Sequence, residues 1–210
     1  MSTVSPTRPV RTGVAVAVSG AVTGGFAGLV YTQVRGDRMA PWILGRATGV
    51  VAYLLLVALV LFGITLSHPN RALRGRSATT RMRTHVTLAV LTLAAVALHV
   101  VVLATDRYAG VGWAGALLPM NATYRPVGVT FGVLGTWLGL LAGLSAGAAG
   151  RLPARVWFPV HRVAALSFVL VLVHGLVTGW DTNLLLGMYV GTGLLVTGFA
   201  ASRYAARGRR

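Results

Sequence analysis

The sequence predicts an all-α integral membrane protein: a six-helix transmembrane bundle with both chain ends on the cytoplasmic side. Three observations lead to this fold class. The 210 residues are 55% hydrophobic and only 10% charged, with a mean hydropathy of +0.74, a balance outside the range of soluble globular domains. Six uncharged runs are each near or above the ~18–20 residues that cross a hydrocarbon core. The arginines are concentrated between alternate runs.

The longest connection between the six predicted spans runs from about Asp106 to Pro126. The spans cover residues 12–34, 47–67, 84–105, 126–150, 163–180 and 182–202. The fifth is the shortest, and we expect Trp157 to His161 to extend it inward. No separate soluble domain is expected. The predicted organisation is a cytoplasmic N-terminal segment of residues 1–11, a membrane domain of residues 12–202 and a basic cytoplasmic tail of residues 203–210.

The first span has two interpretations. Its arginine-bearing start and small-residue core are features of a cleaved signal peptide. However, it is long for the apolar region of a signal peptide, and Gly20, Gly24 and Gly28 form a row suited to helix packing. We expect the span to be retained.

Arginine placement predicts the orientation. The sequence has no lysine, and its arginines fall mainly before span one, between spans two and three, between spans four and five, and after span six. These groups share one side of a six-span bundle, which the positive-inside rule makes cytoplasmic. We therefore expect a multi-pass protein of a cell membrane, the bacterial inner membrane. The net charge of +16 is attributed to topology and to membrane lipid contacts, not to nucleic-acid binding.

Four of the five histidines form two matched pairs. His85 and His99 lie 14 residues apart in the third span, and His161 and His174 lie 13 apart in the fifth. In a helix these separations cover ~21 Å and ~20 Å, so each span carries one imidazole in each half of the membrane. Spans three and five run in the same direction. His85 is therefore expected opposite His161 on the cytoplasmic side, and His99 opposite His174 on the outer side.

Placing an ionisable imidazole inside a membrane costs free energy, so histidines at this depth indicate a functional site. Because imidazole is an axial ligand of heme iron, we predict two stacked hemes: an inner one held by His85 and His161, and an outer one held by His99 and His174. Hydrogen bonds between helices would explain one or two such histidines, but not the matched spacing. The remaining histidine, His68, is expected at the interface.

The two spacings are not equivalent in rotation. At ~100° per residue, 14 steps return to within ~40° of the starting face, whereas 13 steps miss it by ~140°. Pro159 indicates that His161 lies in the first turn of its helix, where the geometry can depart from the ideal. The sequence leaves the rest of this difference unexplained.

Arginines near the histidines are candidates to bind the anionic heme propionates. For Arg83 and Arg162, beside the inner ligands, this role and simple anchoring remain open alternatives. For Arg46, on the outer side of span two, we favour a role as propionate partner or as a cation that steers an anionic substrate, over snorkelling to the interface. Gly49 and Gly63 are candidates for admitting the macrocycles or for helix packing. No catalytic residue is predicted.

Three segments carry a family resemblance. "RMRTHVTLAVLTLAAVALHVVVL" and "VWFPVHRVAALSFVLVLVHGL" resemble the heme-bearing spans of the ferric reductase-like transmembrane domain, and "GRATGVVAYLLLVALVLFGI" is similar to its second span. The family includes ferric reductases, NADPH oxidases and the membrane heme subunit of bacterial methionine sulfoxide reductase systems. The resemblance covers about residues 12–200. It implies a six-helix bundle, two b-type hemes ligated by the four histidines, and electron flow from the cytoplasmic side outward.

The sequence departs from many family members in one respect. It contains no GxGxxG or comparable nucleotide signature after the last span. We therefore expect FAD or FMN and NAD(P)H to act only through a separate partner.

The expected function is that of a diheme membrane cytochrome, the heme-bearing component of an oxidoreductase. It would take electrons from a separate flavoprotein reductase or from quinol and pass them to an external acceptor: ferric iron, dioxygen or a redox partner protein. One alternative is a quinol-linked cytochrome b subunit of a larger respiratory complex. Another is a heme-free transporter or assembly protein. The sequence leaves open the donor, the acceptor and the oligomeric state.

Overall fold

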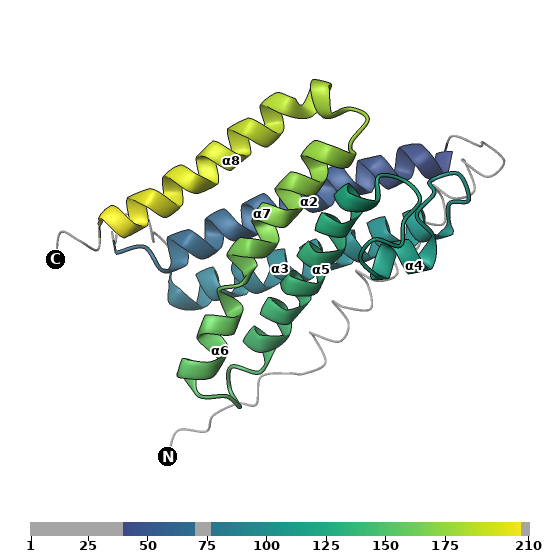
Figure 1. Ribbon diagram of the computed structural model, residues 1–210. Helices are drawn as coiled ribbons and strands as arrows, with labels where there is room; N and C mark the ends of the chain where they lie inside the picture. The colour runs from purple at the N-terminus through teal and green to yellow at the C-terminus, as the bar shows by residue number, and fades with distance from the viewer. Residues whose placement is uncertain (1–39, 70–76, 207–210) are drawn as a thin grey trace, which may run out of the picture. The chain divides into compact units, whose positions relative to one another are not determined.

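The computed structural model describes residues 40–69 and 77–206, and every regular element in these ranges is an α-helix (Figure 1). The helices are α2 (Ala40–Leu66), α3 (Ala78–Thr105), α4 (Gly112–Leu117), α5 (Pro126–Gly147), α6 (Ala154–His161), α7 (Ala164–Thr178) and α8 (Thr182–Ala205).

Five helical segments of the described chain are long and apolar enough to cross a membrane. They are α2, α3, α5, α6 together with α7, and α8, with lengths between 22 and 28 residues. They confirm the second to sixth predicted spans, including the inward extension of the fifth through residues 157–161. The chain is an all-α, multi-pass membrane protein. The predicted first span, residues 12–34, lies outside the described residues.

Three helix ends match the predicted spans, whereas two helices begin earlier than predicted. α3 ends at Thr105, α5 begins at Pro126 and α8 begins at Thr182, as predicted. In contrast, α2 and α3 begin six or seven residues earlier than expected. A hydropathy run stops at the first charged residue, here Arg46 and Arg83, whereas backbone hydrogen bonding continues through it. α3 begins where the Ser77 hydroxyl accepts a hydrogen bond from the Thr80 backbone N–H at 3.2 Å.

The fifth span is broken between α6 and α7. His161 is the last residue of α6 and Pro159 lies inside that helix, so the prediction that His161 lies in a first turn was wrong. Backbone bonds of the 3₁₀ type run across the break, from Val163 N to Val160 O and from Ala165 N to Arg162 O, both at 3.1 Å.

This break bears on the 13-residue spacing. A 3₁₀ turn rotates ~120° per residue, ~20° more than an α-helix. Over about three residues the tighter winding adds ~60°, which reduces the expected deviation between His161 and His174 from ~140° to ~80°. The break therefore supplies part of the rotation that an ideal helix lacks.

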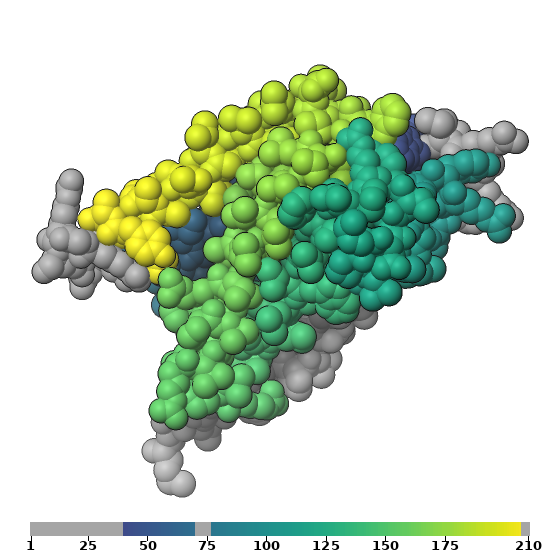
Figure 2. Space-filling model, in the orientation of Figure 1, coloured from purple at the N-terminus to yellow at the C-terminus, as the bar shows by residue number. Residues whose placement is uncertain are grey.

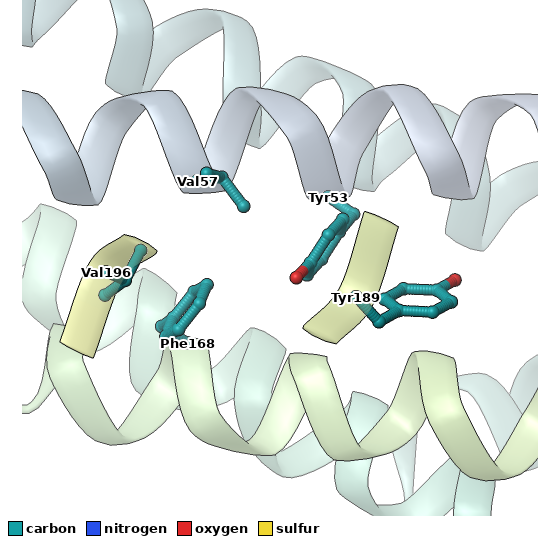
Figure 3. Close-up of a cluster of buried hydrophobic side chains, with 5 residues drawn as sticks. All are labelled: Tyr53, Val57, Phe168, Tyr189 and Val196. Atoms are coloured by element: carbon teal, nitrogen blue, oxygen red, sulfur yellow. The ribbon is translucent and has the colours of Figure 1, made fainter. Parts of the chain in front are cut away.

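The buried core joins α2 to α7 and α8 (Figure 3). The Tyr53 ring lies 5.0 Å from the Tyr189 ring and 6.4 Å from the Phe168 ring, measured between centroids. The Tyr53 hydroxyl is hydrogen bonded to the Thr192 hydroxyl at 2.5 Å. This core fixes the rotation of α2 and α7, which carry parts of the site described below.

Large apolar side chains also face outward. Figure 2 shows a face on which α7 and α8 lie together, and Leu184 and Leu194 of α8 are 84% and 70% exposed. Outward-facing leucines on a helix with a satisfied backbone are expected where the surroundings are lipid.

Candidate heme site

Four histidines face one another in two pairs. The His85 ring of α3 lies 6.2 Å from the His161 ring of α6, and the His99 ring of α3 lies 6.5 Å from the His174 ring of α7, measured between ring centroids. The ring planes in both pairs are inclined by 77°. The structure thus brings together the two pairs predicted from the sequence, at two levels along α3.

The distances between the ring centres match those of two imidazoles bound to one metal ion. A metal–imidazole nitrogen bond is about 2.0 Å, and the nitrogen is about 1.1 Å from its ring centre, so two imidazoles in line through one metal have centres about 6.2 Å apart. The observed 6.2 and 6.5 Å fit one metal ion between the rings of each pair. Direct hydrogen bonding between the two rings would need a closer approach.

Backbone carbonyls orient three of the four imidazoles. The Nδ1 atoms of His99, His161 and His174 lie 2.8, 3.1 and 2.9 Å from the carbonyl oxygens of Gly45, Ala142 and Gly128, respectively. Because a carbonyl only accepts, Nδ1 carries the proton in each neutral ring and Nε2 keeps the free lone pair. A second hydrogen bond of this kind is typical of metal-ligating histidines.

Glycine pairs make room for the two rings at the His99/His174 level. On α2, the Gly45 carbonyl accepts from His99, and a Cβ at Gly49 would lie 2.9 Å from Cε1 of the same ring. On α5, the Gly128 carbonyl accepts from His174, and a Cβ at Gly132 would lie 2.8 Å from its Cε1. On both α2 and α5, therefore, one glycine supplies the carbonyl acceptor for the ring, and the glycine four residues later leaves room for it.

His85 has a different environment. Its Nδ1 is buried and has no hydrogen-bond partner. The adjacent glycine is Gly63, where a Cβ would lie 3.3 Å from Cε1 of His85. Gly49 and Gly63, which were expected to face macrocycles or another helix, thus lie against the imidazoles of α3. His68, predicted to be interfacial, is buried just after the end of α2, with its Nε2 3.4 Å from the Ser202 hydroxyl of α8.

A cavity surrounds the His99/His174 pair. It is lined by residues of α2, α3, α4, α5, α7 and α8, and its lining includes Arg46, the two histidines, Thr92 and Ser167. The described residues contain no cluster of three or more histidine, cysteine or acidic side chains that could hold a metal by itself. Two imidazoles per level leave the other four positions around a metal to a macrocycle. The donor set and the spacing therefore fit heme.

Four arginines lie near the histidine pairs. Arg46 forms an ion pair with Asp181 at the start of α8 and lies over the Trp42 ring, 5.6 Å from the ring centre. Arg83 and Arg162 are exposed. Arg81 was not singled out from the sequence, yet its Nε and Nη1 atoms are buried and have no hydrogen-bond partner. Its position four residues before His85, on the same side of a helix, was the available signal.

A family model described as the ferric reductase like transmembrane component matches residues 48–172. This range is more than half of the 210 residues. It includes His85, His99 and His161 and ends two residues before His174. No curated protein and no solved structure matches the chain.

Proposed function

Because this chain belongs to the family of ferric reductase like transmembrane components, we propose that it is a diheme b-type cytochrome that moves electrons across its membrane. The observation that carries the proposal is the pair of facing imidazoles at each of two levels, with ring centres 6.2 and 6.5 Å apart. His85 and His161 would hold an inner heme, and His99 and His174 an outer heme. The iron of each heme would supply one-electron redox chemistry.

The protein would contribute ligation and orientation. Two imidazoles per iron close the metal to other ligands, which suits electron transfer more than ligand binding. Carbonyl partners on Nδ1 hold three rings with Nε2 free and increase the basicity of those rings as ligands.

The direction of transfer follows from the arginine distribution. The arginine-rich ends of the spans define the cytoplasmic side, and His85 and His161 are the histidines nearest to them. Electrons would enter there from a separate flavoprotein reductase or from quinol. They would leave on the side of His99, His174 and Arg46 for an external acceptor such as ferric iron, dioxygen or a redox partner protein.

Heme quantitation tests the proposal. We expect pyridine hemochrome assays on purified protein to give two hemes per chain. His85→Ala or His161→Ala is expected to remove the inner heme, and His99→Ala or His174→Ala the outer one, so each variant retains one heme. His68→Ala is the matched control and is expected to retain both. A reproducible ratio of one in the unmodified protein, or full heme content in the four histidine variants, would contradict the diheme proposal.

A further inference from the structure

Arg81 stands out among the charged residues of the described chain. It lies on α3, four residues before His85, so the two side chains share one side of the helix, about one turn apart. Its Nε and Nη1 atoms are buried without a hydrogen-bond partner. A guanidinium stays charged in proteins, and buried donors without acceptors are costly. An anion bound to the Arg81 guanidinium would remove this cost.

The described residues contain no carboxylate that could pair with Arg81. Glutamate is absent from the sequence, and the described residues contain two aspartates, Asp106 and Asp181. Asp106 follows the last residue of α3, 25 residues from Arg81 and therefore ~37 Å away along the helix. Asp181 is paired with Arg46, which lines the cavity around the His99/His174 pair. The anion for Arg81 must come from a group other than these side chains.

The nearest proposed group with carboxylates is the inner heme. Side chains on a helix lean toward its N-terminus, so Arg81 is directed from the level of His85 toward the arginine-rich end of α3. A guanidinium binds a carboxylate through two parallel N–H donors. Arg83 is two residues from His85, which places it on the other side of the helix, and it is exposed. Arg162 is exposed as well.

We propose that Arg81 is the residue that binds a propionate of the inner heme and raises the midpoint potential of that heme. The inference rests on the proposed function, since it requires a heme between His85 and His161. A positive charge favours the reduced, more negative form of the site. Arg46 at the outer level is largely neutralised by Asp181, whereas no described side chain neutralises Arg81.

Spectroscopic redox titration of Arg81→Gln, Arg81→Lys and Arg83→Gln tests this assignment. We expect Arg81→Gln to lower the midpoint potential of one heme and to leave the other unchanged. Arg81→Lys retains the charge but loses the planar fork, so it is expected to retain both hemes and to give a smaller shift. Arg83→Gln, which removes the same charge two residues away, is expected to leave both potentials unchanged.

Two further measurements complete the test. The heme affected by Arg81→Gln should be the one that His85→Ala removes. The propionate-bending band in resonance Raman spectra should shift in Arg81→Lys, which keeps the test valid if Arg81→Gln does not accumulate with heme. Unchanged potentials and an unchanged band, with only the loss of co-purified anionic phospholipid, would assign Arg81 to a lipid phosphate and overturn the proposal. Two hemes in the unmodified protein would still support the proposed function in that case.

Discussion

At the residue scale, glycines of α2 and α5 lie against the histidine rings at different distances. A Cβ at Gly49 or Gly132 would approach its histidine to within 2.8–2.9 Å, whereas at Gly63 it would remain 3.3 Å from His85. Contacts below about 3.0 Å require the neighbour to move. A ring held by a carbonyl on one side and a metal on the other has little freedom to do so.

We therefore expect Gly49→Ala and Gly132→Ala to reduce outer-heme occupancy severalfold while leaving the inner heme in place. Gly63→Ala should retain both hemes, with a small shift in the inner-heme spectrum. Gly191→Ala is the matched control, because a Cβ there meets nothing within 4 Å. Hemochrome quantitation with low-temperature difference spectra checks these outcomes. Full outer-heme occupancy in both Gly49→Ala and Gly132→Ala would be inconsistent with close packing around the ligands.

A second prediction at this scale concerns the ion pair between Arg46 and Asp181. In the proposed diheme cytochrome, a guanidinium near the outer heme would favour its reduced form, and the aspartate would oppose that effect. Arg46→Ala is expected to lower the outer-heme midpoint potential, and Asp181→Asn to raise it. The inner-heme potential should change much less, because the proposed inner heme would lie ~21 Å from the outer one along α3.

A double-mutant cycle separates the two contributions. The variant carrying both substitutions should lie between the single variants in outer-heme potential. If the unmodified protein and all three variants have the same outer-heme potential, Arg46 only anchors α2 at the membrane interface.

At the scale of the elements, α2, α7 and α8 are held together by the core around Tyr53. The hydrogen bond between the Tyr53 and Thr192 hydroxyls links α2 to α8 at 2.5 Å. The Thr192 hydroxyl also donates to the Met188 carbonyl at 2.6 Å, so it keeps a partner when the tyrosine hydroxyl is removed. The bond therefore contributes to the association of α2 with α8.

Tyr53→Phe is expected to lower the free energy of unfolding by about 0.6 kcal/mol, the average measured for hydrogen bonds between membrane helices. Heme content should be unchanged, because Tyr53→Phe keeps the aromatic ring that lines the cavity. Thermal denaturation in detergent, followed by heme absorbance, measures the effect. Phe168→Ala is the contrasting variant: it removes a large buried ring that is 4% exposed, so a much larger loss of stability is expected.

At the scale of the whole molecule, the prediction is six spans with both ends in the cytoplasm. Fluorescent protein fused after Arg210 should fluoresce, because it folds on the cytoplasmic side. Alkaline phosphatase inserted near α4, between α3 and α5, should be active, because it lies on the outer side. The opposite pattern would reverse the assignment of inner and outer hemes while leaving the histidine pairs intact.

The sequence was sufficient for properties that depend on position along one helix. Hydropathy located five spans that the structure confirms, and the rise per residue placed His85 level with His161 and His99 level with His174. The helix starts were less well predicted, because a charged residue such as Arg83 ends a hydropathy run without ending a helix. The break after His161 was also missed, since Pro159 indicated a helix start and not an interruption.

What the sequence determined by itself was therefore the all-α membrane class, the levels of the four histidines and their pairing. The tertiary structure decided which groups surround each ring: the Gly45, Ala142 and Gly128 carbonyls, the partner of Arg46, and the burial of Arg81. The physical reason is that depth in a membrane follows from composition and helix rise, which are local. Contacts between side chains depend on how each helix is rotated about its axis and on which helix lies beside it. Those quantities are set only when all the helices pack together.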